Sequence, residues 1–537
     1  MIVDTPDFEA LRTLPADLLA KLGADSPSPG ALTKLRTLVG DGDLYRLAAD
    51  LPRARHKLRN KLLHAAESFA DIPRAEMATA RPVALWRMAR ALNLALDLAG
   101  PVGGTATDAA IVARPAAAVP SIRDLGCGVG ADFCALLELC RAWQCSPADC
   151  VAFERDAFAA WCARANATLV WPAEAQPATD ARRLVRESDV TVAGEAGRAP
   201  FERSSVVFLD PTRRAGGRRT VNDWSQCEPA DSLWLPWAVQ GQPMVVKVAP
   251  AFDWRSFQSP APAQIEAVEW HGEVHELALW WNLPTVAAGA PPEATLVGGA
   301  SISLTHEPFS GGLTRRNTPR AGGPGRRATV LHGAAGASIE SFPCESLFLG
   351  EGQDDLLRRT MDLRDGTPQA GDTVAIPAPA VLRVDLLPAL AAALHAPLWA
   401  GQPNLLGPTG SAVAAAAASR LATTGTVAAV VAAREKELRR ALKGPLAGRR
   451  WQPQVLGLKG APGADALVRL LDHAFAQGGR SGGGGGGNGD RNAVPAGTAL
   501  YTRFHQSHLV LFLEPVSGTR SEVPASGEPG PGNPASR

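Results

Sequence analysis

Three glycines spaced two residues apart form the pattern with the clearest chemical meaning in this chain. Gly126, Gly128 and Gly130 follow Asp124, the acid near the end of a short apolar run that begins at Ser121. Glycine lacks a Cβ atom, so such a turn can adopt positive φ angles and lets a ligand approach bare backbone N–H groups. A helix-like run follows. We therefore expect a strand, a tight turn and a helix start, the arrangement at which doubly wound sheets bind cofactors.

Two later apolar runs also end in an acidic residue. Glu154 closes the run 150–153, and Asp210, followed by Pro211, closes the run 205–209. A carboxylate at the end of the second strand suits a ribose diol, which donates two hydroxyl hydrogens. Together with the glycine turn, this acid indicates an adenosine-containing cofactor, either a dinucleotide or S-adenosylmethionine.

The spacing of the glycines separates these two cofactors in part. The dinucleotide fingerprint is G-x-G-x-x-G, whereas the pattern here is G-x-G-x-G followed directly by Ala131 and Asp132. A dinucleotide places its pyrophosphate at the helix N-terminus, where the carboxylate of Asp132 would repel it. The ammonium group of a methionine moiety would instead be attracted by Asp124 and Asp132. The pattern therefore favours S-adenosyl-L-methionine, and a nucleotide-dependent oxidoreductase is a more distant alternative.

Residues around Asp210 could serve the acceptor of a transferred group. Methyl transfer is an in-line displacement, so its catalyst mainly positions the nucleophile and can take up a proton. Asp210 could orient or deprotonate an N–H or O–H group. Four arginines in the stretch that follows could grip phosphate groups: Arg213, Arg214, Arg218 and Arg219. A solvated surface loop is the alternative, and Lys247 could equally point into the site or extend its amine to solvent.

The surrounding sequence must supply the elements that position these residues. Strands are expected near 121–125, 150–154, 189–193, 205–210, 244–248, 265–270 and 275–281, with helix-like segments between most of them. The last two flank a tight His271-Gly272 turn and should form an antiparallel hairpin. This order predicts a Rossmann-like, doubly wound α/β sheet of seven strands, mostly parallel with one reversed strand.

Periodicity also divides the first part of the chain. Residues 1–105 are expected to form a helical N-terminal region with a strong helix over 83–96. Residues 120–284 should form the α/β domain described above. Residues 285–370 are rich in Gly, Pro and Ala, which predicts a linker with a small β segment.

The last part of the chain resembles a further α/β domain. Within residues 371–515 we expect an alanine-rich helix near 411–433, a basic helix near 434–443 and a terminal strand at 507–513. The glycine run 482–487 is expected to be a flexible loop insertion. Residues 516–537 are rich in Pro, Gly and Ser, which predicts a disordered tail.

The overall composition says more about the cellular compartment of the protein than about its function. The chain has 537 residues and a net charge of +1, from 54 basic and 53 acidic side chains, so any basic surface for a polyanion must be local. Its eight cysteines form no CxxC pair and no zinc pattern with histidine, so we expect buried thiols in a reducing compartment and no metal. Neither a secretory signal nor a membrane span is expected, which predicts a cytoplasmic protein.

At these motifs the chain resembles the class I S-adenosylmethionine-dependent methyltransferases. More narrowly, it resembles the bacterial proteins that join such a domain to a C-terminal THUMP-like domain. The residues that carry the resemblance are Asp124-Leu-Gly-Cys-Gly-Val-Gly-Ala-Asp132, Glu154 and the segments 206–219, 245–250 and 268–280. The resemblance covers most of 30–284 and is looser over 371–515.

The resemblance implies a role for each residue. The residues that should line the methionine part of the cofactor are Asp124, Gly126, Gly128 and Gly130. Glu154 should bind the ribose, and Glu195 should lie near the adenine. Asp210 and Pro211 should face the target nucleophile. Since THUMP domains bind RNA, the resemblance also implies an RNA partner, either tRNA or rRNA.

The sequence therefore predicts an S-adenosylmethionine-dependent methyltransferase with RNA as the favoured acceptor. Basic clusters over 53–61 and 434–450 fit RNA binding, although solvated helix faces would explain them equally. Two other interpretations remain open. One is a non-catalytic RNA-binding protein with a vestigial cofactor fold, and the other is a methyltransferase that acts on protein or on a small molecule.

Overall fold

The computed structural model of the chain describes most of its regular elements. The described residues are 8–23, 27–98, 119–172, 180–191, 205–211, 214–215, 218–219, 227–283, 294–297, 300–305, 324–332, 344–350, 362–400, 402–409, 412–413, 416, 419, 421–443, 446, 451–455, 497–504 and 507–516. The chain folds into two compact units. The first comprises Met1–Thr360 with Ala378–Ala393, and the second comprises Met361–Pro377 with Leu394–Arg537.

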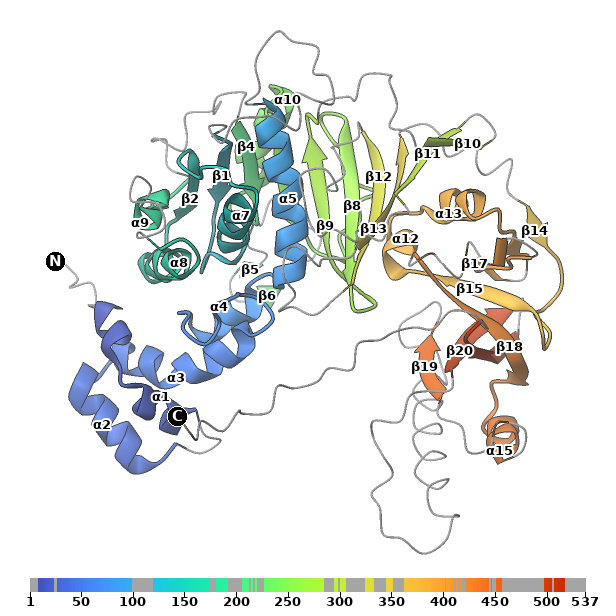
Figure 1. Cartoon of the computed structure of the whole chain (residues 1–537), viewed down its shortest axis with the longest axis horizontal. Helices are drawn as coiled ribbons and strands as arrows, with labels where there is room; N and C mark the ends of the chain where they lie inside the picture. The colour runs from blue at the N-terminus through green and yellow to red at the C-terminus, as the bar shows by residue number, and fades with distance from the viewer. Residues whose placement is uncertain are drawn as a thin grey trace, which may run out of the picture. The chain divides into compact units, whose positions relative to one another are not determined.

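An eleven-stranded sheet is the framework of the first unit (Figure 1). Its strand order is β10-β11-β13-β12-β8-β9-β7-β4-β1-β2-β3. In chain order the strands are β1 Ser121–Leu125, β2 Cys150–Glu154, β3 Val185–Glu187, β4 Ser205–Leu209, β7 Met244–Val248, β8 Ala263–Trp270, β9 Glu273–Trp281, β10 Ala294–Val297, β11 Ala300–Thr305, β12 Gly325–Leu331 and β13 Cys344–Gly350.

The part of the sheet from β3 to β7 is wholly parallel. β1 pairs with β2 on one side and with β4 on the other, while β3 pairs with β2 and β7 with β4. Helix α7 (Ala131–Ala142) follows β1, and α8 (Ala157–Val170) follows β2. The strand order reverses between β1 and β4, and ligands of doubly wound sheets bind outside the carboxyl ends of the strands at such a point.

The predicted hairpin is confirmed. β9 pairs in antiparallel fashion with both β7 and β8. His271 and Gly272 join β8 to β9 with φ angles of 53° and 76°. Two successive positive φ angles define the tight turn whose twist matches that of the flanking strands.

Two features of the sheet differ from the sequence prediction. The sheet has eleven strands rather than seven, because the segment 285–370 adds β10, β11, β12 and β13 beyond β8. β12 pairs in parallel with β8, and the buried Thr329 of β12 donates to Glu266 of β8 across 2.8 Å. This polar residue interrupts the apolar pattern that marks a buried strand. The third strand lies at Val185–Glu187 rather than near 189–193. Its three residues include only one that is buried, so the sequence showed no apolar run at this place.

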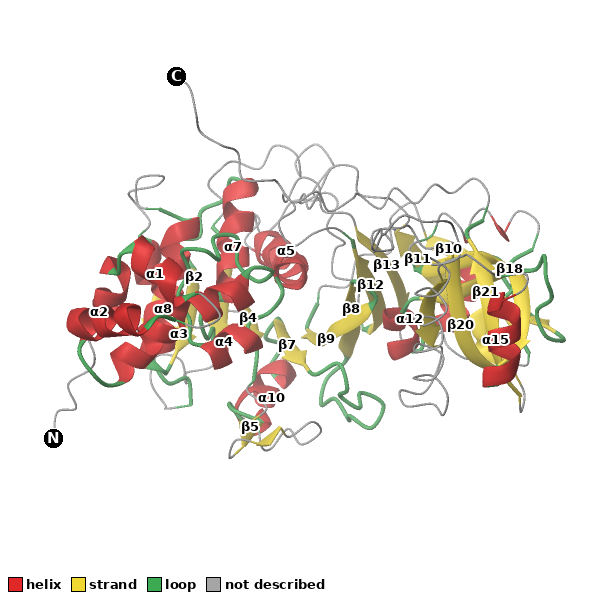
Figure 2. Ribbon diagram, turned by 90° about the horizontal axis from the view of Figure 1, so that it is seen from below, coloured by secondary structure: helices red, strands yellow, loops and turns green. Residues whose placement is uncertain are grey.

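Helix α5 (Arg81–Leu98) lies against the sheet and confirms the helix predicted over 83–96. It packs against α7 and against β1, β4 and β8 (Figures 1 and 2). Every residue from Arg81 to Leu96 is buried, including three arginines. Buried cations need partners, and these arginines pair with acids of α7, β8 and β9: Arg81 with Glu138, Arg87 with Asp132 and Glu276, and Arg90 with Glu266.

The N-terminal helices precede α5. They are η1 Phe8–Thr13, α1 Ala16–Leu22, α2 Pro29–Val39, α3 Asp43–Leu58 and α4 Ile72–Met77. The ring of Phe8 lies 5.1 Å from that of Phe158 on α8, and Trp161 donates its indole N–H to Glu9 across 2.8 Å. The N-terminal region therefore packs on the helix that flanks the glycine turn (Figure 2).

Helices α12 (Pro379–Arg383) and α13 (Leu387–Ala393) complete the first unit. The strands on either side of them in sequence, β15 (Thr373–Pro377) and β16 (Leu398–Trp399), belong to the second unit. The N–H of Ala380 donates to the carboxylate of Glu269 on β8 across 2.9 Å. The guanidinium of Arg383 donates to the carbonyls of Pro250 and Phe252.

An eight-stranded sheet forms the second unit, in the order β14-β16-β17-β15-β18-β21-β20-β19. Its strands are β14 Leu363–Arg364, β15 Thr373–Pro377, β16 Leu398–Trp399, β17 Gln402–Leu406, β18 Ala422–Ala432, β19 Trp451–Val455, β20 Gly497–Phe504 and β21 Ser507–Glu514. The basic helix is confirmed as α15 (Glu435–Lys443), and the terminal strand as β21.

The alanine-rich helix expected near 411–433 is wrong over its second half, where β18 pairs with β15 and β21. Threonine and valine occupy six of the positions from Thr423 to Val431. These β-branched residues favour a strand, and the alanines between them concealed that preference.

Several predictions lie outside the described residues. They are the end of the predicted helical region over 99–105, the glycine run 482–487 and the tail from 517 onward. None of the helices that the structure describes is long and apolar enough to cross a membrane.

Candidate active site

The carboxyl ends of four parallel strands bring the predicted polar residues together. Asp124 on β1 is in register with Phe208 on β4, so Asp210 follows one strand away. Glu154 ends β2 on the other side of β1. Lys247 is the last but one residue of β7, the strand next to β4. The site is therefore built on the rigid core of the sheet.

The glycine turn that joins β1 to α7 has the predicted left-handed backbone. The φ angles of Gly126, Gly128 and Gly130 are 87°, 56° and 83°. A Cβ atom at Gly126 or Gly128 would meet no heavy atom within 4 Å, so the turn presents open space on this side. A Cβ atom at Gly130 would lie 3.1 Å from that of Ala163 on α8. The first two glycines thus leave room for a ligand, while the third allows α8 to approach.

Asp124 is the least satisfied carboxyl group near the turn. It is 1% exposed, and neither of its oxygens has a hydrogen-bond partner in the part of the chain that the structure describes. Burial raises the pKa of Asp124 well above its ordinary value, and the nearby carboxylates of Asp132 and Asp210 raise it further. A cationic ligand group would relieve both effects.

Glu154 lies directly against the glycine turn. Its Oε2 accepts the backbone N–H of Gly128 across 2.8 Å, and its Oε1 accepts that of Asp156 across 2.9 Å. Each carboxylate oxygen keeps a further lone pair. The carboxylate is only partly buried, so it remains able to accept hydroxyl hydrogens from a ligand.

Asp132 is placed at the first turn of α7, as the sequence indicated, but its carboxylate is already engaged. Its Oδ1 pairs with the guanidinium of Arg87, and its Oδ2 accepts the hydroxyl hydrogen of Thr79 across 2.9 Å. Of the two acids expected to attract an ammonium group, Asp124 is therefore the one with both oxygens free of described partners.

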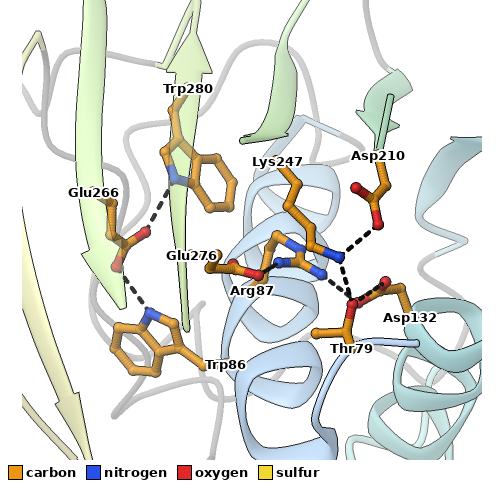
Figure 3. A network of polar contacts seen from close by, with 9 residues as sticks. All are labelled: Thr79, Trp86, Arg87, Asp132, Asp210, Lys247, Glu266, Glu276 and Trp280. Carbon is orange, nitrogen blue, oxygen red and sulfur yellow. Dashed lines mark hydrogen bonds and ion pairs between the residues drawn. The ribbon is translucent and has the colours of Figure 1, made fainter. Parts of the chain in front are cut away.

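Asp210 forms an ion pair with Lys247 inside the site (Figure 3). The distance from Lys247 Nζ to Asp210 Oδ2 is 2.5 Å, and Lys247 Nζ also donates to Thr79 Oγ1 across 2.9 Å. The sequence left open whether Lys247 points into the site or to solvent, and the structure turns it into the site. Pro211, next in the chain, is buried.

Arg87 and Glu276 extend this group of charges and were not expected from the sequence. The guanidinium of Arg87 bridges Asp132 and Glu276 (Figure 3). It also lies 4.8 Å from the ring centre of Phe208. Burial alone would lower the pKa of Arg87, but the two carboxylates raise it above its ordinary value. Burial raises the pKa of Glu276 despite the opposing effect of Arg87. The arginines within the mostly apolar helix α5 were the one sequence feature that could have indicated these buried ion pairs.

Asn166 on α8 holds the glycine turn to the N-terminal region. Its side-chain amide donates to the carbonyl of Val129 across 2.9 Å and to that of Phe69 across 3.0 Å. Its Oδ1 accepts the N–H of Phe69 across 2.8 Å. The turn is therefore fixed from α8 as well as from Glu154.

Carboxyl groups outnumber cations around the turn. The five carboxyl groups belong to Asp124, Asp132, Glu154, Asp210 and Glu276. Two cations, Arg87 and Lys247, lie among them. Five less two leaves an excess of three negative charges when every acid is ionised. No group of three or more His, Cys, Asp or Glu side chains within the described ranges is arranged to hold a metal ion.

The remaining predicted residues lie in or beside undescribed segments. Glu195 and Arg213 are outside the described residues. The backbone of Arg214 pairs with that of Arg219 in a two-stranded antiparallel ribbon. This ribbon is formed by β5 (Arg214–Ala215) and β6 (Arg218–Arg219).

No protein-family model and no curated protein matches the chain. Among solved structures, the chain is similar to the crystal structure of a provisionally assigned methyltransferase from Porphyromonas gingivalis W83, with a TM-score of 0.51 and 17% sequence identity. The alignment covers 95% of this chain and 99% of that chain. At this identity the likeness shows the fold alone, a mixed α/β fold with a large sheet that contains a parallel part.

Proposed function

We propose that this protein is an S-adenosylmethionine-dependent methyltransferase that methylates a nucleophile held at Asp210, with RNA as the favoured acceptor. The observation that carries the proposal is the buried carboxyl group of Asp124, which no described residue hydrogen-bonds. It lies at the end of β1, directly before the glycine turn. An unpartnered buried carboxylate is costly, and the ammonium group of a bound cofactor would offset that cost.

The other residues of the turn fit the same cofactor. Open space beside Gly126 and Gly128 leaves room for the methionine part. The free lone pairs of Glu154 could accept the two ribose hydroxyls. The excess of negative charge suits a cofactor with an ammonium and a sulfonium group better than one with a pyrophosphate. Glu195 remains the candidate for a contact with the adenine.

On the acceptor side, Asp210 would orient an N–H or O–H group of the substrate. When bound, the cofactor supplies an electrophilic methyl group. The carboxylate of Asp210 could take up the proton that the acceptor loses. The arginines that follow Pro211, three of them in the ribbon of β5 and β6, would then hold a phosphate group of the acceptor: Arg213, Arg214, Arg218 and Arg219.

RNA is favoured as the acceptor because exposed cations line α15. Leu438 is the buried residue on the apolar side of this helix. The side chains of Lys436, Arg439, Arg440 and Lys443 are exposed. We expect the double variant R440E/K443E to weaken RNA binding and to reduce the slope of log affinity against log salt by about two. Filter binding over a salt series measures both. The variant R46E, at an exposed arginine of α3, is the control.

Calorimetric titration of the purified protein tests the cofactor. We expect S-adenosylmethionine and S-adenosylhomocysteine to bind and NAD not to bind. The variant D124N should lose affinity about tenfold or more, because a hydrogen bond to a charged partner contributes roughly 1.5–3 kcal/mol. D149N is the matched control, since Asp149 lies just before β2, at the opposite end of the strand from Glu154.

Each result of this titration has a distinct meaning. If the wild type binds neither S-adenosylmethionine nor S-adenosylhomocysteine, the favoured interpretation becomes an RNA-binding protein with a vestigial cofactor fold. Binding of NAD alone would point to an oxidoreductase. Cofactor binding that is accompanied by transfer to protein but not to RNA would keep the methyltransferase and replace its acceptor.

A further inference from the structure

Lys247 occupies a position that a lysine rarely tolerates. All five residues of β7 are buried, and the side chain of Lys247 is 8% exposed. A buried ammonium group destabilises the fold unless its protons are hydrogen-bonded. Two of its three protons have partners close by, Asp210 Oδ2 at 2.5 Å and Thr79 Oγ1 at 2.9 Å.

The direction of these hydrogen bonds is fixed by chemistry. An ammonium group only donates and a carboxylate only accepts. Thr79 Oγ1 therefore accepts from Lys247, and its own hydrogen is donated to Asp132 Oδ2 across 2.9 Å. The hydroxyl of Thr79 thus uses its only hydrogen on Asp132 and one lone pair on Lys247, which orients the amine of Lys247 toward Asp210 (Figure 3).

Asp210 is the outermost member of this chain of hydrogen bonds. Its side chain is 27% exposed, against 8% for Lys247 and 9% for Asp132. Among the described residues, only Lys247 donates to its carboxylate, and it does so at Oδ2. Oδ1 is left to receive a hydrogen from an incoming group.

We propose that Lys247, oriented by Thr79, is a positioning residue that holds the carboxylate of Asp210 toward the acceptor nucleophile. This inference rests on the proposed methyltransferase function. Lys247 lies on a central strand, so it gives Asp210 a rigid reference inside the sheet. Without it, the carboxylate would be free to rotate away from the acceptor.

The cofactor side of the site does not depend on this arrangement. Asp132 keeps its ion pair with Arg87 when the hydroxyl of Thr79 is removed. Glu154 and Asp124 form no described hydrogen bond with Lys247 or Thr79. Loss of the hydroxyl should therefore impair transfer and spare cofactor binding.

The variants T79V and T79S test this separation in the full-length protein. We would measure S-adenosylhomocysteine affinity by calorimetry, and transfer of labelled methyl groups from S-adenosylmethionine to total bacterial RNA and total bacterial protein. T79V should lower transfer about a hundredfold, the usual effect of a misplaced reacting group, and change the dissociation constant by less than about threefold. T79S should restore transfer, because it returns the hydroxyl.

T329V is the matched control. Thr329 is also fully buried and donates to a carboxylate, that of Glu266, in the neighbouring part of the sheet. The T329V variant should unfold at a lower temperature than the wild type, but it should keep S-adenosylhomocysteine binding and methyl transfer. K247M is a second test, with the same expected loss as T79V.

The possible failures can be told apart. A wild type that binds no cofactor, or that binds it and methylates neither pool, overturns the proposed function and this inference with it. Undiminished transfer by T79V and K247M overturns the positioning role alone. A parallel loss of cofactor affinity and transfer in T79V would make the threonine part of the cofactor site and also overturn the role.

Discussion

Gly128 donates its backbone N–H to the carboxylate of Glu154 across 2.8 Å, so the acid that ends β2 and the turn that follows β1 are directly bonded. The same carboxylate accepts the N–H of Asp156 at the start of α8. The position of the Glu154 carboxylate is therefore fixed by its own strand β2, by the turn that follows β1 and by the start of α8. A group bound in the turn would meet this carboxylate in a fixed orientation.

The variant E154A should raise the dissociation constant of S-adenosylhomocysteine about tenfold or more. It removes the candidate partner of the ribose and leaves the N–H groups of Gly128 and Asp156 without their acceptor. Calorimetry measures the change. E187A, at the exposed end of β3, is the control, and equal affinity in both variants would remove Glu154 from the cofactor site.

The variant G130A should destabilise the protein by about 2 kcal/mol. The φ angle of 83° strains any residue with a Cβ atom, and that atom would lie 3.1 Å from the Cβ of Ala163. Urea unfolding measures the difference. The control is G30A in α2, where a Cβ atom meets nothing within 4 Å, and the helix should gain up to about 1 kcal/mol. Equal stability of G130A and the wild type would contradict the strained turn.

Cofactor binding should release a proton from Asp124, and affinity should rise with pH. Burial raises the pKa of Asp124 well above its ordinary value. At a pH below that raised pKa the carboxyl group carries a proton, which the ammonium group of the cofactor would displace. Calorimetry of S-adenosylhomocysteine in two buffers of different ionisation enthalpy counts this proton. The variant D124N should bind more weakly and release none. Unchanged proton release in D124N would assign the proton to another group.

Glu269 should make the protein less stable as the pH rises from about 4.5 to 7. Burial raises the pKa of Glu269 to about 7 from an ordinary value of 4.5, against the weaker opposing effect of the N–H of Ala380. The folded state then binds the proton more tightly than the unfolded state, so stability is greatest below the unfolded pKa and is lost as the pH passes through the folded value.

The variant E269Q keeps an acceptor for Ala380 and should lack this pH dependence. The free energy of unfolding of the wild type, relative to E269Q, should fall by an amount on the order of 2 kcal/mol between pH 4.5 and pH 8. Urea unfolding at a series of pH values measures it. E273Q, at the exposed start of β9, should follow the wild type. A constant difference between wild type and E269Q would refute the prediction.

The parts of the site that the sequence predicted are those set by local rules. The glycine spacing demanded positive φ angles, and all three glycines have them. Acids that end apolar runs met at one edge because parallel strands end together. The ion pairs behind them were not predictable in this way, because Arg87 lies 45 residues from Asp132 and 189 from Glu276.

The same limit applied to the fold. Hairpins and long helices carry their signals locally, and the hairpin of β8 and β9 and the helix α5 were predicted. A small β segment was expected within 285–370, but not that it joins this sheet. β12 pairs with β8 although β9, β10 and β11 lie between them in the chain, and the buried Arg327 and Thr329 interrupt its apolar pattern. In β18, the many alanines led to the prediction of a helix, whereas valine and threonine prefer strands and the segment forms one.

The order of the two units along the chain has a consequence for how this protein can be divided. Ala378–Ala393 belongs to the first unit, although the chain forms β15 of the second unit just before it and β16 just after it. A fragment ending at Thr360 would lack α12 and α13, and would leave Glu269 without the N–H of Ala380. Neither unit is one continuous stretch of the chain, so no single cut between residues separates the two units as complete pieces.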